Sequence, residues 1–163
     1  MNPFDIKSAL LARHAQHVVL IHFPIALFLA GAALDFAAQW SARRSSQRLG
    51  QRSTQPPTAG ALAAAAYYNL LLAAWSSVPV MITGLLAWRW QLEGAALKGN
   101  LRLHLALGIA SSVLIWLTLW VHARARRHPD LPWPAYRWPL ELLAALVVGL
   151  TGHIGGFLSG VNG

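Results

Sequence analysis

Three of the seven histidines, His22, His104 and His153, lie inside long apolar stretches that carry almost no other charge. An ionisable side chain at membrane depth is costly, so it usually faces the interior of a helix bundle and marks a ligand site or a proton pathway. Imidazole is a ligand for haem iron, copper and zinc. The chain has no cysteine, which excludes iron–sulfur clusters and covalently attached haem c within it.

The elements that must position these histidines are four apolar stretches of about 20 residues or more, long enough to cross a hydrocarbon core as helices. They are Gln16–Trp40, Gly60–Trp88, Leu101–His122 and Trp138–Ser159. With 56% hydrophobic and 11% charged residues, the composition is also that of a membrane protein. The sequence therefore predicts an all-α integral membrane four-helix bundle, a single domain over residues 1–163.

Three smaller features complete this expected architecture. Asn2-Pro3 is typical of a helix start, so Pro3–Ala12 is expected to be a short interfacial helix. Residues 41–58 are rich in Ser, Gln and Arg and are expected to form a mobile basic loop. Pro24 and Pro79 fall within spans and should bend them, since proline removes a backbone donor.

The three apolar histidines are expected at similar depth on one side of the bundle. His22 and His153 lie about six residues inside the ends of their spans, and His104 about three, so their depths agree within one or two helical turns. We therefore rank His22 and His153 ahead of His104 as metal ligands. His17 lies roughly 140° around the helix from His22 and ranks below all three, together with His122.

Small residues adjoin these histidines, notably Gly152 and Gly156 beside His153, and Gly108 beside His104. One interpretation is close helix packing, which is common in membranes. The other, which three histidines at one depth favour, is room for a flat macrocycle. Four-helix bundles build cofactor sites from inward side chains, so haem b is the expected cofactor. Two histidines would be axial ligands, which leaves the third for a second metal, a propionate or a quinone oxygen.

Two further sets of residues leave alternatives open. His104 and His122 are 18 residues apart and share a helix face, which allows a second haem, but the basic stretch after His122 favours a solvated interface. Asp35 and Glu141 are each expected to pair with an arginine such as Arg137. The alternative for these carboxylates is a proton or quinone site.

The net charge of +8 comes from arginines that flank the spans, which argues against a nucleic-acid groove. If the spans alternate, eight basic residues share one side and five the other. Because cytoplasmic loops carry the Lys/Arg excess, the arginine-rich side should be cytoplasmic and both termini should face outward.

Three segments resemble a bacterial family of predicted four-helix membrane proteins of unknown function. They are the run His22-Phe23-Pro24-Ile25-Ala26-Leu27, His104 with Gly108 and Ile109, and the run Thr151-Gly152-His153-Ile154-Gly155-Gly156-Phe157-Leu158. The resemblance covers about Gln16–Gly163 and implies a four-span domain of the bacterial inner membrane with a role in electron transfer. Some relatives are joined to cytochrome c modules, whereas this chain is expected to lack a fused electron carrier, since it stops at Gly160–Gly163.

The expected function is thus a haem-b-binding subunit that passes electrons between a periplasmic cytochrome c or dehydrogenase and the quinone pool or another membrane subunit. No nucleophile elbow, phosphate loop or dinucleotide fingerprint is present, so a stand-alone enzyme is less expected. The alternative is a cofactor-free structural or anchoring subunit surrounded by membrane lipid. A small proton-relaying transporter is a third, weaker hypothesis.

Overall fold

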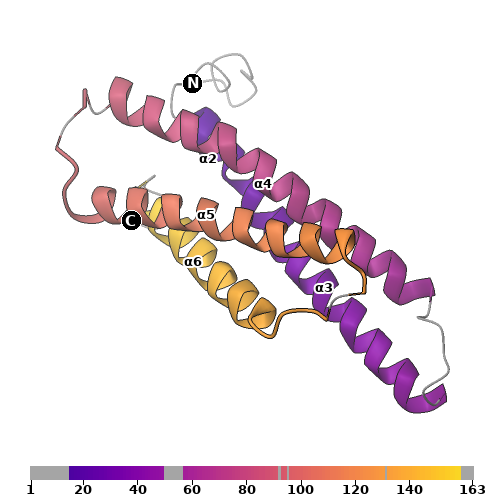
Figure 1. Cartoon of the computed structure of the whole chain (residues 1–163). Helices are drawn as coiled ribbons and strands as arrows, with labels where there is room; N and C mark the ends of the chain where they lie inside the picture. Colours follow the sequence, from indigo (N-terminus) through magenta and orange to yellow (C-terminus); the bar gives the residue numbers. More distant parts are fainter. Residues whose placement is uncertain (1–14, 50–56, 92, 95, 131, 159–163) are drawn as a thin grey trace.

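The computed structural model describes residues 15–49, 57–91, 93–94, 96–130 and 132–158. The expected interfacial helix at Pro3–Ala12 lies outside these residues, as does the end of the chain from residue 159. The described residues contain helices and no strand (Figure 1). The helices are α2 (Ala15–Leu20), α3 (His22–Leu49), α4 (Pro57–Gln91), α5 (Gly99–Arg127) and α6 (Arg137–Leu158).

All four predicted spans are confirmed as helical segments long and apolar enough to cross a membrane: Gln16–Gln47, Thr58–Trp90, Gly99–Arg127 and Arg137–Leu158. The expected loop at 41–58 is partly wrong, because α3 continues to Leu49 and α4 begins at Pro57. Arg, Gln, Leu and Ala all have high helix propensity, so the helix continues past the end of the apolar stretch.

The two prolines within the spans behave differently. A turn at Ile21 separates α2 from α3, three residues before Pro24. Pro24 has no N–H to donate to the Leu20 carbonyl, which accounts for an interruption at this point. Pro79, in contrast, lies inside a continuous α4.

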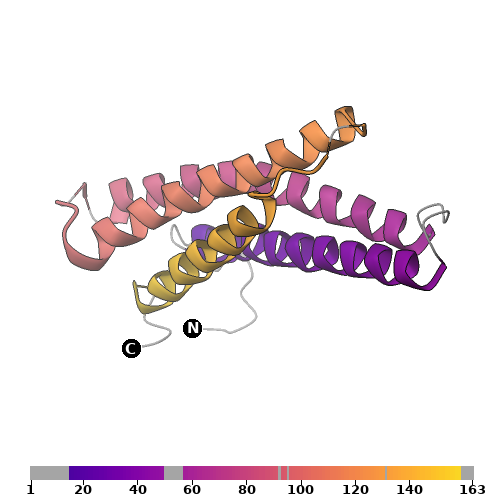
Figure 2. The same cartoon turned by 60° about the horizontal axis from the view of Figure 1, so that its bottom comes forward.

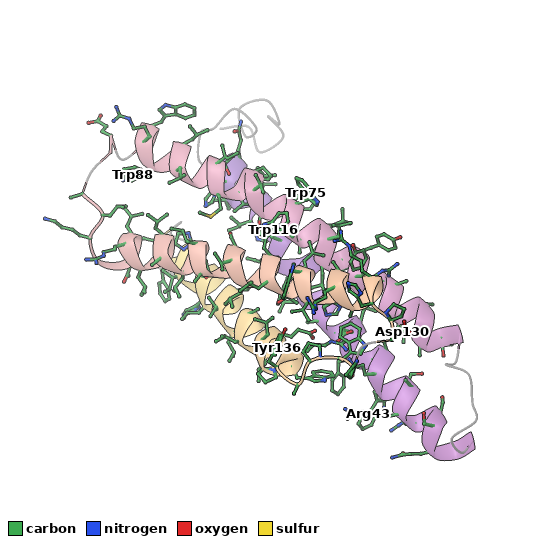
Figure 3. All side chains as sticks on the ribbon, in the orientation of Figure 1. Arg43, Trp75, Trp88, Trp116, Asp130 and Tyr136 are labelled. Carbon is green, nitrogen blue, oxygen red and sulfur yellow. The ribbon has the colours of Figure 1, made fainter. Side chains whose placement is uncertain are left out.

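The helices form a ring in which α3 packs on α4, α4 on α5, α5 on α6 and α6 on α3, while α2 packs on α4 and α3. In the turned view, α4 and α5 lie above α3 and α6 (Figure 2). We call the end where α4 stops and α5 starts the α4–α5 end, and the end where α5 stops and α6 starts the α5–α6 end. Trp88 marks the first end, and Arg43, Asp130 and Tyr136 lie toward the second (Figure 3).

The inward faces of α3, α5 and α6 each follow alternating steps of four and three residues, the spacing of a helix stripe that faces a bundle core. On α3 the stripe consists of Pro24, Phe28, Gly31, Asp35 and Ala38. On α5 it consists of His104, Gly108, Ser111, Ile115, Thr118 and His122. On α6 it consists of Arg137, Glu141, Ala144, Val148, Thr151 and Gly155.

The middle of each stripe builds the apolar core, which includes Phe28, Leu70, Ile115 and Val148. The opposite faces carry large apolar side chains that are exposed, such as Leu146 at 64%. Such faces suit lipid. Polar and ionisable side chains of the stripes lie toward the two ends, and these positions define the candidate sites.

Candidate functional site

At the α4–α5 end, the imidazole of His17 on α2 packs directly against α4. Its Nδ1 lies 3.2 Å from Oγ1 of Thr83. A Cβ placed on Gly84 would be 2.9 Å from Cε1 of His17, so only glycine leaves room for the ring in this position. The Thr83 hydroxyl donates to the carbonyl of Pro79 at 2.9 Å, so it is free to accept from Nδ1–H of His17. This contact is consistent with a hydrogen on Nδ1, the tautomer in which Nε2 keeps its lone pair.

His104 on α5 makes the equivalent contact with α6. A Cβ on Gly155 would lie 3.0 Å from Cε1 of His104. The Nδ1 of His104 is buried and has no hydrogen-bond partner among the described residues, which is uncommon for a buried polar atom. His104 is also within electrostatic range of His17. Two imidazoles from different spans therefore lie at this end of the bundle, each packed on a glycine of a neighbouring helix.

The structure does not bring His22 and His153 into this interior. Both side chains are exposed. The Nδ1 of His22 donates to the carbonyl of Val18 at 2.8 Å, within its own chain segment, and the ring of His153 contacts Phe157. His22 and His153 each lie two residues from a position of the inward stripe. Two residues correspond to roughly 200° of rotation, so both side chains are on the outward face of their helix. Of the three histidines expected to converge, only His104 faces inward, and its inward neighbour is His17.

The glycines also divide into different roles. Gly152 packs beside Ile25 of α3, where an added Cβ would lie 3.3 Å from the Ile25 side chain. Gly156 is half-buried on α6. The histidine rings instead contact Gly84 and Gly155. Neither glycine can be identified as a contact by looking only for small residues next to a histidine in the sequence. The stripe spacing does identify them, because Gly155 continues the α6 stripe and Gly84 lies seven residues beyond the buried Ser77.

At the α5–α6 end, four buried ionisable side chains from three helices form a second site, which we call the ionic cluster: Asp35, His122, Arg137 and Glu141. The Nη2 of Arg137 pairs with Oδ1 of Asp35, and its Nε lies 3.4 Å from Oε1 of Glu141. The same Glu141 oxygen lies 2.8 Å from Nε2 of His122. The expected pairing of both carboxylates with Arg137 is confirmed.

The expected placement of His122 at a solvated interface is wrong. Its side chain is buried and bonded to Glu141, although the next residues of α5 are basic. The reason is rotational, since His122 lies five full turns from His104 and therefore on the same inward stripe. Sequence proximity to arginines does not indicate which face of the helix it occupies.

Aromatic and amide groups enclose the ionic cluster. The guanidinium carbon of Arg137 lies 3.6 Å from the ring centroid of Trp133, which also contacts the ring of His122. The amide of Gln39, with its oxygen turned toward Arg137, accepts from the guanidinium. A cavity of about 240 Å³ adjoins the cluster and is lined in part by Asp35, Gln39, Arg43, Trp133 and Arg137.

Donor atoms of Asp35, His122 and Glu141 lie within 4.8 Å of one another, as they would around a metal ion. The guanidinium of Arg137, however, is already paired with both carboxylates. A fixed cation at this point already supplies part of the positive charge that a metal would otherwise supply. The arrangement is that of a buried ion-pair network, which is a different chemistry from the paired imidazoles at the α4–α5 end.

A search of the curated proteins and of the solved structures found no significant match to the chain. A family model described as "Predicted membrane protein (DUF2231)" matches residues 13–163, which include all four spans, both sites and the three segments whose sequence resembles a four-helix membrane family. The chain therefore belongs to this DUF2231 family of predicted membrane proteins.

Proposed function

We propose that the chain is a haem-b-binding membrane subunit that transfers electrons between a periplasmic redox partner and the quinone pool or another membrane subunit. The observation that carries the proposal is that His17 and His104, from different spans, each pack on a glycine at the same end of the bundle, with the Nδ1 of His104 buried and unpartnered among the described residues. When bound there, haem b would supply a one-electron redox centre.

The residues present fit such a group. Two neutral imidazoles are the donor set of a low-spin b-type haem, and they come from different spans, as in other cofactor-binding helix bundles. The bond between His17 and Thr83 orients the ring and presents Nε2, the role that outer hydrogen bonds commonly play for ligand histidines. Gly84 and Gly155 keep the helix surfaces beside both rings free of side chains.

The direct test is the optical spectrum of the full chain purified from haem-replete cells. We expect non-covalent haem with a Soret band and the sharpened visible bands of low-spin iron after dithionite reduction. A colourless preparation would contradict the proposal. A high-spin spectrum would show that one imidazole alone binds the iron, and that the pairing of His17 with His104 is not retained.

The proposed orientation places the α4–α5 end in the periplasm and both termini with it, in the bacterial inner membrane. Support comes from the excess of basic residues around the α5–α6 end, eight against five. The imidazole pair would then lie on the periplasmic side, where a cytochrome c or a dehydrogenase could exchange electrons with it. Lipid would cover the exposed apolar faces.

A cysteine at Ser46 tests this orientation. Ser46 is exposed near the end of α3, on the side proposed to be cytoplasmic. We expect Ser46→Cys to resist a membrane-impermeant thiol reagent in intact cells and to react after the cells are opened, because the natural chain has no competing cysteine. Labelling in intact cells would reverse the orientation and move the imidazole pair to the cytoplasmic side.

One observation favours a second candidate, a cofactor-free structural subunit. His17 and His104 already pack against α4 and α6, so the imidazoles would serve as interhelical contacts in their own right. Membrane helices commonly associate through small residues and polar side chains of this kind. The same spectrum separates the two candidates, since only the first requires bound haem.

A further inference from the structure

The charges of the ionic cluster do not balance. Asp35 and Glu141 contribute two negative charges, and Arg137 contributes one positive charge. None of the four side chains of the cluster, His122 included, is more than 4% exposed. A net charge in such surroundings carries a large desolvation cost, so a buried cluster of this kind requires one further positive charge, from a cation or from a bound proton.

Among the residues that the structure describes, neighbouring groups do not supply a further cation. The neutral amide of Gln39 on α3 and the indole of Trp133, in the segment before α6, contact the cluster. On α4, Ala63 lines the adjoining cavity. Arg43 lines the cavity but is itself exposed to solvent. Three other arginines near this end lie over aromatic rings, Arg126 over Tyr67, Arg124 over Trp120 and Arg44 over Trp40, and Arg127 is exposed.

We propose that the ionic cluster is a proton-binding site that holds one proton, carried by His122 against Glu141, and exchanges it with the aqueous phase at the α5–α6 end. Protonated His122 brings the cluster to two positive and two negative charges. The bond between Nε2 of His122 and Oε1 of Glu141 is then charge-assisted, which is consistent with its length of 2.8 Å.

The geometry favours a proton over a divalent metal. Ligand atoms about 2.0–2.2 Å from a tetrahedral metal stand roughly 3.4 Å apart, whereas these two atoms are 2.8 Å apart. That separation accommodates a hydrogen. Arg137, paired with both carboxylates, also repels a second fixed cation.

The cavity supplies the exchange route. It is lined by Asp35 and Arg137 of the cluster and by the exposed Arg43, so it connects the buried groups to the surface. The cavity of about 240 Å³ has room for several water molecules, which would bond to its polar lining groups Asp35, Gln39 and Arg137. A proton leaving His122 would pass first to Glu141, to which it is hydrogen-bonded, and then past Arg137 and Asp35 to this water. The site is separate from the imidazole pair and does not depend on haem.

The protonation state of His122 tests the proposal directly. The full chain is labelled with nitrogen-15 at histidine in lipid nanodiscs, and the His122 signals are assigned by their loss in His122→Gln. In the natural chain at pH 7 we expect both ring nitrogens to carry hydrogen. In Glu141→Gln the remaining Asp35 and Arg137 charges balance, so His122 should shift to the neutral form. Exposed His128 serves as the control and should not change between the two proteins.

Each other outcome overturns the proposal. Neutral His122 in the natural chain at pH 7 would show that the cluster does not hold the proton, and this measurement needs no variant. Unchanged His122 signals in Glu141→Gln would show that charge balance does not control the proton. Asp35→Asn provides a second balanced cluster if Glu141→Gln does not fold. Stoichiometric metal in the purified chain, with His122 signals that move on chelation, would identify a metal site instead.

Discussion

Substitution of either inward histidine, His17→Ala or His104→Ala, is expected to remove the low-spin haem spectrum of the purified chain. Loss of an outer hydrogen-bond partner alone commonly lowers metal affinity by about 10–100-fold, so loss of a direct ligand should exceed that range. Alanine supplies no ligand atom at either position. The measurement is haem content per chain together with the reduced-minus-oxidised spectrum.

The matched controls are His22→Ala and His153→Ala, which change the same residue type at similar depth on outward faces. Both should retain the parental spectrum, and so should His122→Ala, which lies in the ionic cluster. The opposite pattern would be loss of haem in His22→Ala and His153→Ala with retention in His17→Ala and His104→Ala. It would show that the ligands are His22 and His153, the pair that sequence depth ranks first. It would also mean that α3 and α6 rotate when the cofactor binds.

Replacement of the central cation, Arg137→Leu, should destabilise the folded chain by about 3–5 kcal/mol, because it leaves the carboxylates of Asp35 and Glu141 buried without their shared partner. Reversible unfolding in mixed micelles measures the loss. Arg126→Leu is the control, since it removes an exposed arginine that lies over Tyr67, a contact worth about 0.5–1 kcal/mol. A loss of less than about 1 kcal/mol in Arg137→Leu would show that water reaches these carboxylates in the folded protein.

The spans are predictable from the sequence because an uninterrupted apolar stretch of about 20 residues matches the thickness of a bilayer core. Their limits are less predictable. The last part of α3, from Ser41 to Leu49, is polar enough to resemble a loop but is made of residues that favour helix. The interruption at Ile21 follows from Pro24, whereas the same residue type at Pro79 leaves α4 continuous.

The site is harder to predict because depth in the membrane and direction around a helix are separate quantities. Depth alone ranks His22 and His153 first, and both lie on outward faces. The inward direction on a helix can be taken from its carboxylate, which must avoid lipid. Gly155 lies 14 residues, or close to four full turns, after Glu141 and therefore shares its inward face. His153 is rotated about 120° around the helix from Glu141 and does not share that face. The position of His17 cannot be obtained this way, since the break at Ile21 interrupts the helical phase.

The ionic cluster is only partly predictable for a related reason. Pairing of Asp35 and Glu141 with Arg137 follows from the cost of an isolated charge in an apolar span. The inclusion of His122 does not follow from its neighbours, because the basic residues after it suggest solvent. Its 18-residue spacing from His104, which places both on one face, is the better guide.

The ion pair between Asp35 and Arg137 joins the first span to the last, and this has a consequence for biosynthesis. A ribosome adds roughly 5–20 residues per second, so Asp35 is made on the order of 5–20 s before Arg137. During that interval its carboxyl group lacks the guanidinium of Arg137, and the neutral acid is the form that costs least free energy inside the membrane. Arrival of α6 allows it to ionise, so the final span completes the insertion of the first.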